Sequence, residues 1–85
     1  MTYTDFTALP FVTSQNGHAT SLWAVQASGD WAADNATGRG FADALVGYVR
    51  SAADPAILPL IAGAIGERRT GIEAGFWTRL AESLS

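Results

Sequence analysis

One cluster of polar side chains stands where the sequence predicts the start of a helix. Asp30, Asp34 and Asn35 lie within six positions of one another. Two carboxylates at this spacing could hold a cation or share a proton. Acidic residues in the first turn of a helix also stabilise it by complementing the helix dipole. The cluster therefore has two interpretations, a polar pocket built on Asp30 and Asp34 or a charged helix start without a ligand.

A second cluster, Arg68 and Arg69, directly precedes Thr70, where another helix is expected to begin. Guanidinium groups beside the free N–H groups of a helix N-terminus suit a phosphate or carboxylate ligand. Glu73 would lie in the first turn of this helix, however, and repel an anion. Arginines at the end of the preceding helix would also stabilise that end. Arg68, Arg69 and Thr70 are thus either an anion site or structural residues.

Catalytic signatures are absent from the sequence. His18 is the only histidine, and no nucleophile and orienting acid accompany it in a recognisable pattern. Because there is no Cys, disulfides and thiolate metal sites are excluded. We predict no enzymatic activity, no catalytic residue, no metal and no cofactor.

Composition limits the classes of partner. The chain has 85 residues and a net charge of −3, whereas nucleic-acid-binding domains usually carry a basic surface. The most apolar run is twelve residues long and contains two prolines, which is too short to span a bilayer. The first residues do not have the pattern of a signal peptide. We expect a cytoplasmic protein that binds neither nucleic acid nor membrane.

The pattern along the chain predicts one small, mainly α domain over residues 1–85. Residues 1–28 are expected to be extended and residues 30–84 to form three helices. Asn16-Gly17 favours a tight β-hairpin turn between two extended runs. The predicted fold class is a mainly α, three-helix domain whose irregular N-terminal segment forms either a short hairpin or a loop, and α+β is the alternative class. A loop followed by a short helix over residues 22–27 is the other option for this region.

Three sets of signals mark the helices. Asp30 is the expected N-cap of a helix from Trp31 to about Ala53. Asp54 and Pro55 are the expected N-cap and first residue of a second helix that ends near Gly66. Thr70 and Glu73 have the spacing of a capping box, which opens a last helix that runs to about Leu84.

Helical spacing also predicts which side chains are buried. On the first helix Gly38 falls on the apolar side, where its missing side chain would let another backbone approach. Trp31 and Trp77 lie on or beside apolar faces, so we expect both in the core. Trp23 cannot be assigned from the sequence. The apolar side of the first helix comprises Trp31, Gly38, Ala42, Leu45, Val49 and Ala52, and that of the last comprises Ile72, Phe76, Trp77, Leu80 and Leu84.

The second helix has no charged residue, and its isoleucines and leucines share one side. The other side consists of small residues, Ala56, Pro59, Ala62, Gly63 and Gly66. Such a surface lets another helix pack at short range, or it is simply exposed at little cost or covered within the chain. The leading hypothesis is a non-enzymatic interaction module that binds a protein partner or a second copy through this surface. The alternative is a small-ligand or anion-binding domain that uses Arg68 and Arg69 or the Asp30–Asp34 cluster.

Overall fold

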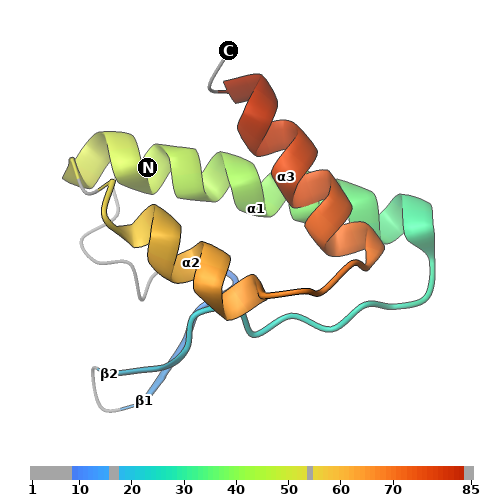
Figure 1. Cartoon of the computed structure of the whole chain (residues 1–85), viewed down its shortest axis with the longest axis horizontal. Coiled ribbons are helices and arrows are strands. Elements are labelled where there is room, and N and C mark those ends of the chain that lie inside the picture. The colour runs from blue at the N-terminus through green and yellow to red at the C-terminus, as the bar shows by residue number, and fades with distance from the viewer. Residues whose placement is uncertain (1–8, 16–17, 54, 84–85) are drawn as a thin grey trace.

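The computed structural model describes residues 9–15, 18–53 and 55–83. Within them the chain forms a mainly α domain with a two-stranded hairpin, which confirms the predicted fold class. The elements are β1 (Thr13–Gln15), β2 (His18–Ser21), α1 (Trp31–Ala52), α2 (Ile57–Ile65) and α3 (Gly71–Ser83). In Figure 1, α3 crosses the long α1, α2 lies beside them, and the hairpin projects from the body below α2.

The hairpin is antiparallel, with Gln15 opposite His18 and an irregular register between Thr13 and Ser14. The hydroxyl groups of Thr13 and Thr20 form a hydrogen bond of 2.9 Å across it. The predicted turn residues, Asn16-Gly17, lie outside the described residues. Residues 22–27 form no helix, so the alternative of a loop and a short helix is wrong.

The segments flanking the hairpin bring two aromatic side chains into the core. The Ala24 N–H donates to the Phe11 carbonyl at 2.8 Å, which holds the two segments together. Phe11 and Trp23 are buried, with ring centroids 5.0 Å apart. Trp23 also packs against Phe76 of α3 at 4.7 Å. Trp23, which the sequence left unassigned, is therefore a core residue.

Helix α1 has the predicted N-cap, because the Asp30 carboxylate accepts from the Ala33 N–H at 3.2 Å. The helix ends at Ala52, and the C-cap residue Ala53 has a left-handed conformation with φ of 52°. Trp31 is 60% exposed, so its expected place in the core is wrong. The reason is its terminal position: Gly71 of α3 packs against the Trp31 backbone and leaves the indole uncovered.

Helices α1 and α3 cross at a pair of glycines. A Cβ atom on Gly38 would overlap the backbone carbonyl of Ile72, and one on Gly75 would overlap that of Asn35. The backbones of the two helices are therefore in direct contact, as the position of Gly38 predicted. This contact sets the distance between α1 and α3.

Helix α2 begins at Ile57, two residues later than expected, after a turn in which the Leu58 N–H donates to the Pro55 carbonyl. Ala56 is at the N-cap without a side-chain hydrogen bond, and Asp54 lies outside the described residues. The later start places Pro59 in the first turn, where N–H groups have no helical acceptor, so the proline costs no hydrogen bond. The end at Gly66, with φ of 60°, is as predicted.

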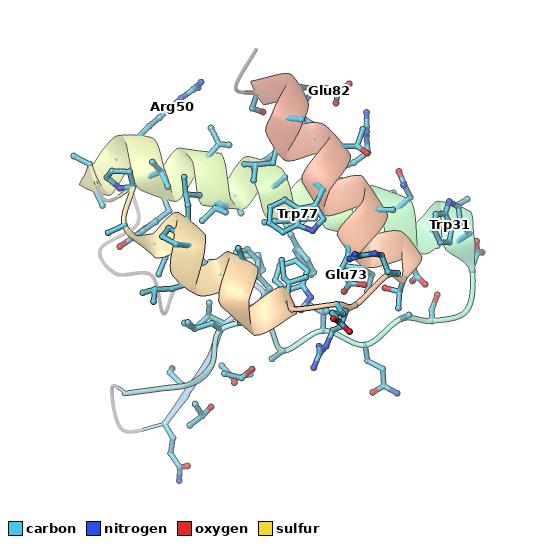
Figure 2. The ribbon with its side chains drawn as sticks, in the orientation of Figure 1. Trp31, Arg50, Glu73, Trp77 and Glu82 are labelled. Atoms are coloured by element: carbon cyan, nitrogen blue, oxygen red, sulfur yellow. The ribbon has the colours of Figure 1, made fainter. Side chains whose placement is uncertain are left out.

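Helix α3 follows the predicted capping box. The backbone N–H of Thr70 donates to the Glu73 carboxylate at 2.8 Å. Phe76 and Leu80 are buried as expected, whereas Trp77 is 39% exposed and not a core residue. Trp77 lies on the flank of α3 that faces α2 rather than α1, and α2 does not cover it (Figure 2). Leu84 lies outside the described residues.

Candidate functional site

An apolar groove opens between α2 and α3, with α1 as its floor. Its volume is about 300 Å³. Each of the three helices contributes apolar side chains to its lining, which consists of Leu45, Leu58, Pro59, Ile61, Ala62, Phe76, Trp77 and Leu80. These eight residues form the α2–α3 groove.

A smaller hollow of about 90 Å³ adjoins the groove towards the C-terminal end of α1. The two hollows share Leu45, Leu58 and Leu80, and the smaller one is also lined by Arg50 and Ser83. The apolar surface therefore continues to a cationic side chain at its edge. Figure 2 shows Arg50 at this end of α1 and Trp77 in the middle, between α2 and α3.

The groove stays open because of the residues on α2. Its buried side chains, Ile57, Ile61 and Ile65, form one row that contacts the core. The residues beside that row, Pro59 and Ala62, are too small to reach α3. Trp77 stands across from them with its ring against that of Phe76, at a centroid distance of 5.1 Å. A large aromatic side chain thus faces an α2 wall in which Pro59 and Ala62 stand beside Leu58 and Ile61.

All five residues of the predicted interaction surface are exposed, and the structure gives them different positions. Pro59 and Ala62 line the groove. Gly63 lies beside them with no atom within 4 Å of an added Cβ. Ala56 and Gly66 occupy the N-cap and C-cap of α2. The sequence indicated the α2 wall of the groove but not the α3 wall; the neighbouring pair Phe76-Trp77, which widens the apolar side of α3, was the available signal.

Asp34 is one of the two predicted acidic residues, and its carboxylate is fully engaged by the preceding turn. It accepts from the Ser28 hydroxyl at 2.7 Å, from the Ser28 N–H at 3.0 Å and from the Gly29 N–H at 3.4 Å. The hydrogen bonds from Ser28 lower the pKa of Asp34 below its usual value. With Asp30 at the N-cap, both carboxylates serve the helix start, which agrees with the interpretation that needs no ligand.

Glu73 is a buried carboxylate, only 2% exposed, that the sequence identified as part of the capping box alone. One of its oxygens accepts from the Trp23 indole N–H at 2.9 Å, and the other accepts from both the N–H and the hydroxyl of Thr70. Burial raises the pKa of Glu73, but the hydrogen bonds from Thr70 and Trp23 outweigh it, and the pKa lies below its usual value. The group is a structural anchor.

Arg68 and Arg69 are exposed and bind carbonyl groups. Arg68 donates to the Trp23 carbonyl at 3.3 Å, and Arg69 donates to the Arg68 carbonyl at 3.5 Å. The Thr70 N–H, which an anion at this helix start would need, already donates to Glu73. This arrangement supports the structural role of the arginine pair more than an anion site.

Four other charged side chains on α1 and α3 pair across the helix crossing. Arg39 contacts Glu82 at 3.1 Å, and Arg79 contacts Asp43 at 2.8 Å. In the part of the chain that the structure describes, no three His, Asp or Glu side chains are close enough to hold a metal ion. Over the same residues, no helix is both long and apolar enough to cross a bilayer.

No protein-family model matches the chain, and the comparisons with curated proteins and with solved structures give no match either. The site must therefore be interpreted from its own geometry. The carboxylates of Asp34 and Glu73 are engaged in local hydrogen bonds, and the groove between α2 and α3 is apolar. Such a surface can exclude water from a second apolar surface.

Proposed function

We propose that this protein is a non-enzymatic protein-interaction module and that the α2–α3 groove is its binding surface. The observation that carries the proposal is the groove itself: eight apolar residues from three helices surround an open volume of about 300 Å³. A single exposed apolar side chain is ordinary on a protein surface, whereas a contiguous apolar hollow is typical of binding sites.

Trp77 is the expected energetic centre of the contact. It is 39% exposed and lies at the groove wall, so a partner that covers it would remove a large aromatic surface from water. Tryptophan is enriched among the residues that dominate binding energy at interfaces. The flat wall of Pro59 and Ala62 opposite it allows close approach of a partner backbone.

Photo-crosslinking tests this proposal. A benzophenone amino acid at Ala62, within the groove, should give covalent protein adducts in cells that make the protein. The same group at Trp31 is the control, because Trp31 is exposed at the end of α1 far from Trp77 (Figure 2). Adducts from position 62 should disappear when Gly63 is also replaced by Trp, which fills the adjacent surface. Equal labelling from positions 62 and 31, or none from either, would contradict the proposal.

A further inference from the structure

The strap, residues 22–29, is the extended segment that connects the hairpin to α1. Figure 1 shows it below the helices, alongside the loop that joins α2 to α3. In the part of the chain that the structure describes, residues 25–27 make no hydrogen bond. The hydrogen bonds between the strap and the rest of the molecule are therefore confined to its two ends.

A buried carboxylate from a different helix holds each end of the strap. Glu73, in the first turn of α3, accepts from the Trp23 indole N–H at 2.9 Å. Asp34, in the first turn of α1, accepts from the Ser28 hydroxyl at 2.7 Å and from the Ser28 N–H at 3.0 Å. Hydrogen bonds to a charged group are strong, and a buried charge that loses its donor destabilises the structure. These two carboxylates are the latches of the strap.

The latch at Trp23 also supports the α2–α3 groove from behind. The Trp23 ring packs against Phe76 with a centroid distance of 4.7 Å. Phe76 lines the groove and in turn contacts the ring of Trp77 at 5.1 Å. The three rings thus form a continuous row from the strap to the groove wall. Because protein interiors are closely packed, removing Trp23 from this row frees Phe76 to move.

We infer that the strap opens as one unit and that only its docked form keeps the α2–α3 groove in the shape that binds a partner. The inference rests on the proposed function and adds its regulation. Since residues 25–27 have no hydrogen bond of their own, an end that leaves its latch weakens the attachment of the other end. Segments of this kind open locally at a lower free energy than the whole chain.

The crossing of α1 and α3 does not depend on the strap. The two helices meet through Gly38 and Gly75, and their charged pairs are formed between their own side chains. An opened strap therefore leaves the crossing in place and changes the packing around Phe76. A partner that binds the docked form better than the opened one shifts the strap towards docking, and a strap that opens more readily binds that partner less well.

Native-state hydrogen exchange of the purified chain, followed by NMR, tests whether the strap opens as a unit. The Trp23 indole N–H and the Ser28 backbone N–H report on the two ends, and the backbone N–H of Leu45 reports on unfolding of the whole chain. The protection factors at both ends of the strap should be similar and at least about tenfold lower than that of Leu45.

Ser28→Ala removes one donor to Asp34 and leaves Trp23 unchanged. We expect it to lower the protection of the Trp23 indole, at the opposite end of the strap, about tenfold. Asp43→Asn is the matched control, because it removes the exposed contact of another α1 carboxylate with Arg79. It should change that protection by less than about threefold.

Two results of the exchange measurement would overturn the inference. A loss of protection at position 28 with Trp23 unchanged would show that the ends of the strap move independently. Equal protection of Trp23 and Leu45 would show that the strap opens only when the whole chain unfolds.

Photo-crosslinking at position 62 tests the connection to the groove. Across the variants Ser28→Ala, Asp34→Asn and Trp23→Phe, the yield of adducts should fall in proportion to the docked fraction that hydrogen exchange measures. A yield that stays constant while the docked fraction falls would overturn the connection. If the unchanged chain gave no adduct, the proposed function would fail, whereas hydrogen exchange would still decide whether the strap opens as a unit.

Discussion

The Glu73 carboxylate connects parts of the chain that are far apart in sequence. It binds the start of its own helix at Thr70 and the indole of Trp23, fifty positions away. A buried polar group that loses its hydrogen-bond partner destabilises the fold more than the bond itself contributed. The contact between Glu73 and Trp23 therefore matters for how the N-terminal segment attaches to α3.

Replacing Trp23 with Phe removes the donor and leaves a buried carboxylate oxygen without its partner. We expect the free energy of unfolding to fall by about 1–3 kcal/mol from this effect, measured by urea denaturation. Trp31→Phe, the same change at an exposed position, should alter it by less than about 0.5 kcal/mol. A double-mutant cycle with Glu73→Gln separates the hydrogen bond from the lost ring volume. A coupling energy near zero would contradict the role given to Glu73.

Asp34 and Glu73 together make stability depend on acidity. The pKa of each carboxyl is lower in the folded chain than usual, so the folded state binds fewer protons than the unfolded state in the acid range. Their contribution to the free energy of unfolding is complete at pH values above the pKa that these carboxyl groups have in the unfolded chain. It is lost as the pH falls through the lower pKa that they have in the folded chain. We expect the urea midpoint to be flat near neutral pH and to drop below about pH 4. Asp34→Asn with Glu73→Gln should flatten that drop, and an unchanged drop would contradict the assignment.

The sequence predicted the contacts of Glu73 only where its partner is close in the sequence. The spacing of Thr70 and Glu73 is a local pattern, and the structure contains the backbone hydrogen bond that it implies. The third partner, Trp23, depends on how the N-terminal segment packs against α3, which no local pattern encodes. The prediction that Trp31 is buried was wrong for a similar reason. Helical spacing does not show where the partner helix ends.

The crossing of α1 and α3 depends on Gly38 and Gly75. At these positions the backbone of the facing helix occupies the space that a Cβ atom would need. Gly40 lies two residues after Gly38 on α1. It is exposed and has no atom within 4 Å of an added Cβ. Gly38 and Gly40 are therefore a natural pair for comparison.

Gly38→Ala should destabilise the fold by roughly 1–3 kcal/mol or more, because the two helices must move apart. Gly40→Ala should stabilise it by up to about 1 kcal/mol, since alanine favours a helix and meets no obstacle there. Thermal and urea unfolding of both variants measure the difference. Equal effects of the two substitutions would show that the helices do not meet at Gly38.

At the level of elements, the sequence predicted the existence and ends of the helices well. Asp30, Gly66 and Thr70 are local signals, and the helices they bound lie where those signals place them. The predicted start of α2 was two residues too early, because the Asp54-Pro55 pattern also suits a turn before a helix. Gly38 was recognised as a point of close approach, but its partner on α3 was not.

At the level of the whole molecule, the groove arises from unequal packing of the three helices. α1 and α3 meet backbone to backbone, whereas α2 contacts the core mainly through one row of isoleucines. The space that remains between α2 and α3 is apolar and open. The sequence could indicate the small wall on α2, but only the tertiary arrangement shows that Trp77 stands opposite it.

Three tryptophans report on three parts of the molecule. Trp23 is in the core, Trp77 is in the groove, and Trp31 is exposed away from it (Figure 2). The measurement that tests the central claim most directly follows their indole N–H signals by NMR as an extract of the cells that make the protein is added to the purified, isotope-labelled chain. If the groove binds a protein partner, the Trp77 signal moves while those of Trp23 and Trp31 stay in place, and Gly63→Trp abolishes the movement. Three signals that stay unchanged, or a movement of Trp31 alone, would contradict the account.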